Sequence, residues 1–205
     1  MAYEYLDGIG DTVETGTEDL TKASKLTITG NDPALKKSEA TKLYVRTVDN
    51  KNFRVYMCGI NKLDSPYFQN RFCLFMDGLK ADQTVTLELG SDLSGNGHVP
   101  NIQLGMMISS IRNCKAHTTT LAAGRCSFAE SCMFVYGKEC VISPYGAIQF
   151  TGIKAYEKIV TPFTVYFTQI LKDAVSKGIL TEEHFTILTT TGKSIMRTHT
   201  GVYVP

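Results

Sequence analysis

The residues best suited to chemistry lie between Leu121 and Gly152. Small residues come first, then Cys126 and Ser127, and an apolar run from Met133 to Tyr136 that Gly137 ends. This pattern predicts a tight turn followed by a buried helix, with Ser127 at the helix N-terminus, where backbone N–H groups lack intrahelical partners. A serine in that position has the surroundings that a nucleophile and an oxyanion hole require.

A serine nucleophile also needs a base, because an unassisted hydroxyl is weakly nucleophilic. The chain has four histidines, and His98 is the one in a Gly-rich loop that could reach an active-site cleft. One hypothesis therefore pairs Ser127 with His98, or with another histidine as the base. A surface or structural role is the default expectation for every histidine of the chain. It applies also to His117, which begins a strand, and to His184 and His199, which have no motif around them.

The same stretch also has structural interpretations. Serine is a common helix N-cap, so Ser127 is a candidate for that role as well. Cys126 and Cys132 offer an alternative thiol nucleophile, again with no paired histidine in the sequence. Glu130 is unusual within an apolar helix. The sequence leaves open whether Glu130 caps the helix, pairs with Arg125 or faces an internal chamber.

The segments that must position these residues alternate between strand and helix patterns. Two β-rich segments, 43–45 and 53–60, flank a turn-type cluster and predict a hairpin. The alternation beyond them favours βαβ units and an α/β fold with a mainly parallel sheet. The expected elements are a helix from Pro66 to about Met76, a strand over 84–89, a helix over 102–111, a strand over 116–121, and strands over 139–142 and up to Phe150.

The two ends of the chain differ from this central part. Residues 1–40 are polar and predict an N-terminal arm, flexible or docked on a neighbouring subunit, with one short strand at Leu26–Ile28. Residues 41–205 are expected to form one domain. Its C-terminal segment is helical from Pro162, with an aromatic stripe suited to core or subunit packing and a stop at Gly178.

Composition excludes several classes of function. The chain has 205 residues, 43% of them hydrophobic, and a net charge of +1, so we expect no nucleic-acid partner. No apolar run reaches the roughly 18 residues that span a bilayer, and the acidic start lacks a signal-peptide pattern, so we expect a cytoplasmic protein without a membrane partner. The six cysteines are expected to be reduced, and no motif indicates a metal or a cofactor.

The order of segments from Arg54 onward resembles the ClpP-like branch of the ClpP/crotonase superfamily, including ClpP-type peptidases of phages. The resemblance covers about three quarters of the chain. The segment 53–60 resembles the first core strand of that family. The landmarks around the nucleophile helix match at Gly124, Gly137, Pro144 and Phe150.

This resemblance implies repeated ββα units, and an oxyanion-binding turn at Gly95 and Gly97. It also places Phe128 in the nucleophile position and Thr151 in the histidine position. The function it implies is a ClpP-like homologue with degenerate catalytic residues that assembles into homo-oligomeric rings. An ATPase or another assembly partner is a further expectation, with a location in the host cytoplasm or the virion if a phage encodes the chain.

Two enzymatic alternatives remain open. The first is an active ClpP-type serine endopeptidase, with Ser127 as a shifted nucleophile and His98 as its base. The second and weaker alternative is a crotonase-like enzyme acting on acyl thioesters, for which the sequence offers no evident pair of acid and base carboxylates.

Overall fold

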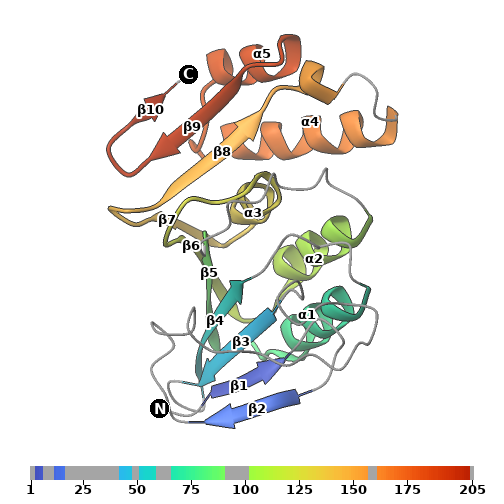
Figure 1. Ribbon diagram of the computed structural model, residues 1–205, viewed down its shortest axis with the longest axis vertical. Coiled ribbons are helices and arrows are strands. Elements are labelled where there is room, and N and C mark those ends of the chain that lie inside the picture. Colours follow the sequence, from blue (N-terminus) through green and yellow to red (C-terminus); the bar gives the residue numbers. More distant parts are fainter. Residues whose placement is uncertain are drawn as a thin grey trace.

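The computed structural model describes residues 3–6, 12–16, 42–47, 51–58, 66–90, 102–156 and 161–203, which form two sheets and the helices beside them (Figure 1). The larger sheet contains β1 (Tyr3–Leu6), β2 (Thr12–Gly16), β3 (Lys42–Thr47), β4 (Asn52–Cys58), β5 (Thr84–Leu89), β6 (His117–Ala122) and β7 (Glu139–Ile142). The smaller sheet contains β8 (Ala147–Thr151), β9 (Ser194–Thr198) and β10 (Val202–Tyr203). The helices are α1 (Pro66–Gly78), α2 (Ile102–Asn113), α3 (Phe128–Phe134), α4 (Thr161–Ser176) and α5 (Glu182–Thr190), with a 3-10 turn, η3 (Ile153–Tyr156).

The larger sheet has the strand order β2-β1-β3-β4-β5-β6-β7. Strands β4 to β7 are parallel, and the helices α1, α2 and α3 connect them in turn. The α/β fold with a parallel sheet that the sequence predicts is therefore confirmed. The predicted hairpin is confirmed as well, because β3 pairs antiparallel with β4, with Tyr44 opposite Tyr56.

Two strands lie within the predicted N-terminal arm. Strand β1 pairs antiparallel with both β2 and β3, so this part of the chain extends the larger sheet. The sequence indicated only Leu26–Ile28 as a strand in the arm, and that segment lies outside the described residues. The sequence Tyr-Glu-Tyr-Leu of β1 contains strand-favouring tyrosines, but a segment of four residues within a polar stretch is too short to indicate a strand or its partner.

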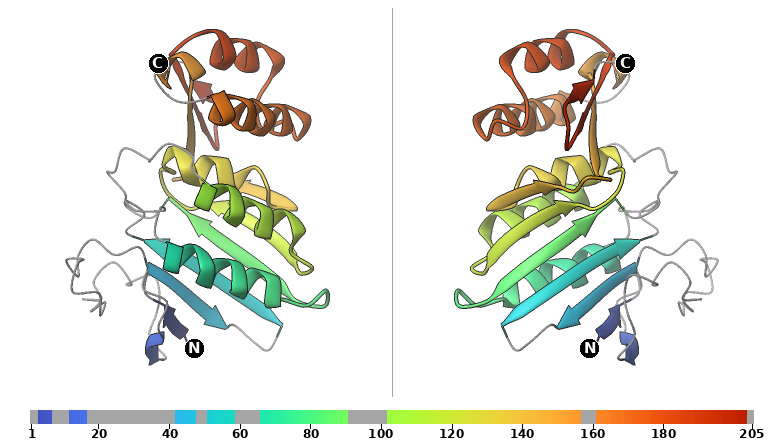
Figure 2. Two further views of the ribbon diagram at one scale, coloured as in Figure 1. Left: turned by 90° about the vertical axis from the view of Figure 1, so that its right-hand side faces the viewer. Right: turned by 90° about the vertical axis from the view of Figure 1, so that its left-hand side faces the viewer.

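Helices α1 and α2 lie side by side on one face of the larger sheet, as both views in Figure 2 show. The side chains of β5 and β6 that alternate toward the interior are buried. On β6 two of these are threonines, and the hydroxyl of Thr120 donates to the carbonyl of Phe134, 2.7 Å away. A buried hydroxyl with a partner costs little, so a threonine-rich strand is tolerated beside α3.

The C-terminal elements form a second layer at the end of the molecule beyond β7 (Figure 1). The aromatic stripe of α4 packs within this chain, because Phe167, Ile170 and Leu171 are fully buried. Gly178 follows α4 with a φ of +67°, a backbone conformation that favours glycine and ends the helix where the sequence predicts. No helix in the described part of the chain has both the length and the apolar character needed to cross a membrane.

Candidate functional site

The candidate site lies where β5 and β6 end and α3 begins. The backbones of Gly90 and Gly124 are in direct contact there: a Cβ atom on Gly90 would lie 2.3 Å from the Gly124 carbonyl oxygen. Gly90 also has a φ of +86°. Both conditions require glycine, so these residues let the two strand ends converge on the start of α3.

Ser127 is the N-cap of α3. Its backbone is extended, with φ −63° and ψ 169°, and its Oγ accepts a hydrogen bond from the backbone N–H of Glu130 at 3.3 Å. The carbonyl of Ser127 accepts the hydroxyl of Ser131 at 2.8 Å, and that hydroxyl accepts the N–H of Gln149 on β8 at 2.9 Å. The N-cap interpretation of Ser127 is thus confirmed, and the cap also connects α3 to the smaller sheet.

Glu130 is fully buried and completes the cap from the other side. Its Oε2 accepts the N–H of Ser127 at 2.7 Å, and its Oε1 accepts the N–H of Gly90 at 2.9 Å. The carboxylate therefore joins the end of β5 to the first turn of α3. Of the three roles that the sequence left open for Glu130, capping is confirmed. Arg125 instead donates to the side chain of Gln149 at 2.8 Å.

Burial dominates the electrostatics of this cap. Desolvation raises the pKa of the Glu130 carboxyl above its ordinary value, although the hydrogen bonds from Gly90 and Ser127 oppose the rise. Desolvation, together with the nearby Glu130, also raises the pKa of the Cys126 thiol well above its ordinary value. Cys126 consequently stays protonated at neutral pH, whereas a thiol nucleophile must reach the thiolate form.

The described histidines have partners away from the cap. His117 Nε2 lies 3.7 Å from a carboxylate oxygen of Glu139, and His199 Nδ1 lies 2.9 Å from the carbonyl oxygen of Ile142. His184 caps α5, where its Nδ1 accepts the N–H of Thr181 at 3.2 Å. Among the residues that the structure describes, no hydrogen bond joins an imidazole to Ser127.

Of the remaining predicted site residues, two are described by the structure and three are not. Phe128 is almost fully buried, and its ring centroid lies 4.9 Å from that of Phe167 on α4. The hydroxyl of Thr151 lies 3.1 Å from that of Ser194. His98, Gly95 and Gly97 lie outside the described residues, so the pairing of Ser127 with His98 and the oxyanion turn stay predictions.

Sequence reasoning missed the second partner of Glu130 and the contact between Gly90 and Gly124. The cap itself had a signal, since serine followed three residues later by glutamate is the capping-box pattern. The bond from Gly90 to Glu130 had none, because it joins residues 40 positions apart. Only the convergence of β5 and β6 brings those groups together.

Comparison with known proteins defines the fold of this chain. No protein-family model and no curated protein matches it. It is similar to a solved enoyl-CoA hydratase/isomerase family member, with a TM-score of 0.50 and 15% identity, over 74% of this chain and 63% of that one. A probable enoyl-CoA hydratase/isomerase from Mycobacterium abscessus is similar with a TM-score of 0.47 and 13% identity, over 74% of this chain and 63% of that one.

The first of these likenesses shows a crotonase-type α/β fold with four parallel strands. This chain spans 63% of the length of that structure. The crotonase part of the resemblance read from the sequence is therefore confirmed at the level of fold. The assignment to the ClpP-like branch stays a prediction.

Proposed function

We propose that this chain is a self-assembling protein of crotonase-type fold that lacks serine-hydrolase activity. The observation that carries this proposal is the reciprocal cap between Ser127 and Glu130. The Ser127 hydroxyl accepts the N–H of Glu130, and the Glu130 carboxylate accepts the N–H groups of Ser127 and Gly90. The Ser127 hydroxyl and the Glu130 carboxylate, which could have been reactive groups, thus hold the end of β5 and the first turn of α3 together.

Two further observations support the absence of hydrolysis. Nucleophilic serines depend on an adjacent base, and losing that base costs several orders of magnitude in rate. The three described histidines contact other partners, and the family positions for nucleophile and base hold Phe128 and Thr151. Phe128 fills the interior against Phe167, where a catalytic hydroxyl would instead need access to substrate.

Exposed apolar side chains support the assembly part of the proposal. Leu74 on α1, Met106 on α2 and Val165 on α4 are 60%, 49% and 69% exposed. Leu74 and Met106 lie on helices that pack side by side, and apolar groups that gather on a surface often mark contacts with other protein chains. In this proposal the assembly is a ring of ClpP-like homologues that works with an ATPase or another assembly partner. Light scattering should give a multiple of the chain mass, and a monomer at all concentrations would refute assembly.

A fluorophosphonate probe tests the absence of hydrolysis. We expect no labelling of the full chain, while an active serine hydrolase in the same sample is labelled, and no cleavage of casein. Ser127→Ala and Ser127→Asp separate the two roles of the residue, because aspartate preserves the cap but cannot serve as a hydroxyl nucleophile. Labelling of the wild type and cleavage of casein that both variants abolish would instead establish the serine endopeptidase.

A second candidate function is chemistry on an acyl thioester with Glu130 as the acid or base. It is favoured by one observation, the buried carboxyl at the strand ends, whose pKa burial raises toward the range in which general acids and bases work. Incubation with a crotonyl thioester tests it. Turnover that Glu130→Gln abolishes, while Glu139→Gln retains it, would favour this enzyme over the assembly protein.

A further inference from the structure

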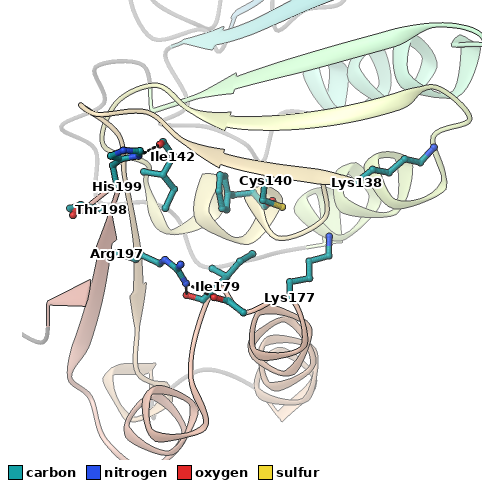
Figure 3. Close-up of a pocket in the computed structure, with 10 residues that line it drawn as sticks. Lys138, Cys140, Ile142, Lys177, Ile179, Arg197, Thr198 and His199 are labelled. Carbon is teal, nitrogen blue, oxygen red and sulfur yellow. Dashed lines mark hydrogen bonds between the residues drawn. The ribbon is translucent and has the colours of Figure 1, made fainter. Parts of the chain in front are cut away.

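A separate cavity of about 410 Å³ lies at the opposite end of α3 from the cap (Figure 3). It opens between the C-terminal end of α4, strand β7 and the last residues of β9. Cavities of this size take small organic molecules. Neither Ser127 nor Glu130 lines it, so a ligand there would act independently of the proposed function of the cap.

Positive side chains from three separate segments of the chain surround this cavity. Lys138, Lys177 and Arg197 line it together with His199, and none of its described lining residues is acidic. The nearest carboxylates along the chain are engaged elsewhere: Asp173 accepts the hydroxyl of Tyr136 at 2.7 Å, and Glu139 accepts that of Thr119 at 3.3 Å. Among the described residues, no salt bridge within 4 Å joins a carboxylate to Lys138, Lys177 or Arg197.

Backbone carbonyls, rather than carboxylates, hold these cations in place. Lys177 Nζ donates to the carbonyl of Gly137 at 2.6 Å, and Arg197 Nη1 donates to the carbonyls of Gly178 and Ile179. An ammonium has three donors and a guanidinium five, so both side chains are oriented while donors remain for a ligand. Lys138 differs, because its Nζ contacts three carbonyls at 2.7–3.2 Å and is fully used.

Part of the remaining lining is apolar. Phe134, Ile142 and Ile179 contribute an aromatic ring and two branched side chains to the same cavity. A ligand that fits must therefore combine negative charge with an apolar group. Lysine and arginine together favour phosphate, because arginine can form paired hydrogen bonds and lysine adds a point charge.

We propose that this cavity binds a small phosphomonoester with an aromatic or apolar substituent. Lys177 and Arg197 hold the phosphate, and the substituent packs against Phe134, Ile142 and Ile179. The ligand class follows from the juxtaposition of cations and apolar side chains around one cavity.

Titration calorimetry of the full chain with phenyl phosphate tests this proposal. We expect saturable binding, while phenol, which lacks the charge, does not bind, and inorganic phosphate, which lacks the ring, binds more weakly. Benzoate distinguishes phosphate from carboxylate recognition. Benzoate binding as tight as that of phenyl phosphate would overturn the ligand class.

Matched lysine variants locate the site. Lys177→Gln removes a cation from the cavity, just after the end of α4, whereas Lys172→Gln removes one from the exposed surface of α4, outside the lining. We expect the first to weaken phenyl phosphate binding about tenfold, since a charge-assisted hydrogen bond is worth about that factor, and the second to have little effect. Equal weakening by both, or no binding to the wild type, would show that these cations only stabilise helix ends.

Discussion

Replacing Glu130 tests the central contact of the cap. In Glu130→Gln the amide oxygen can accept one backbone N–H, but the amide NH2 then faces the other. One buried donor loses its partner, which we expect to lower the free energy of unfolding by about 1–3 kcal/mol. Glu130→Ala removes both acceptors and leaves a cavity, so its loss should reach about 3–5 kcal/mol.

Urea unfolding followed by circular dichroism measures these losses, since the chain has no tryptophan to report by fluorescence. Glu139→Gln is the matched control, because Glu139 is exposed and its loss should stay within about 0.5 kcal/mol. A double-mutant cycle of Ser127→Ala with Glu130→Ala should give a coupling energy of about 0.5–3 kcal/mol. If Glu130→Gln unfolds like the control, the carboxylate does not hold β5 to α3.

Comparing the wild type with Glu130→Gln also tests how the contribution of Glu130 to stability depends on pH. Burial raises the pKa of the folded Glu130 carboxyl above its unfolded value of 4.5, so between these values the folded chain binds more protons than the unfolded chain. The contribution of Glu130 to stability is therefore complete below pH 4.5 and declines as the pH rises through the folded pKa. Subtracting the unfolding curve of Glu130→Gln at each pH isolates this trend. A contribution that grows with pH would contradict it.

The described contacts also predict the outcomes of substitutions at Gly90 and Phe128 and of one labelling experiment. Gly90→Ala should cost more than about 3 kcal/mol in urea unfolding, whereas Gly178→Ala, with a similar φ but open space around it, should cost about 1–2 kcal/mol; equal losses would argue against the backbone contact at Gly90. Phe128→Ala should lower the unfolding free energy by about 3–5 kcal/mol, and a loss below about 1 kcal/mol would mean that the ring is not core. Cys126 and Cys132 should resist iodoacetamide in the native chain and react in urea, because burial raises the pKa of both thiols; rapid native labelling in mass spectra would contradict their burial.

Much of the fold was predictable because its signals are local. Pro66 marks the start of α1, Gly178 the end of α4, and the apolar alternation over 84–89 identifies β5. Each depends on the conformational preferences of a few neighbouring residues, which act before any tertiary contact forms. The pairing of β1 with β3 depends instead on a strand more than thirty residues away, and no local pattern indicates it.

The candidate site also depends partly on local signals and partly on contacts between residues distant in the sequence. Ser127 and Glu130 are three residues apart, and that spacing predicts a helix cap because both groups reach the first turn of the same helix. The sequence alone thus established the crotonase-type order of strands and helices, the position of α3 and the residue types at its start. Tertiary structure decided what the glutamate does, because the ends of β5 and β6 converge on it and bring the Gly90 N–H within 2.9 Å. A buried carboxylate must take whichever donors the surrounding fold supplies, and here the fold supplies two backbone N–H groups that make it a structural link.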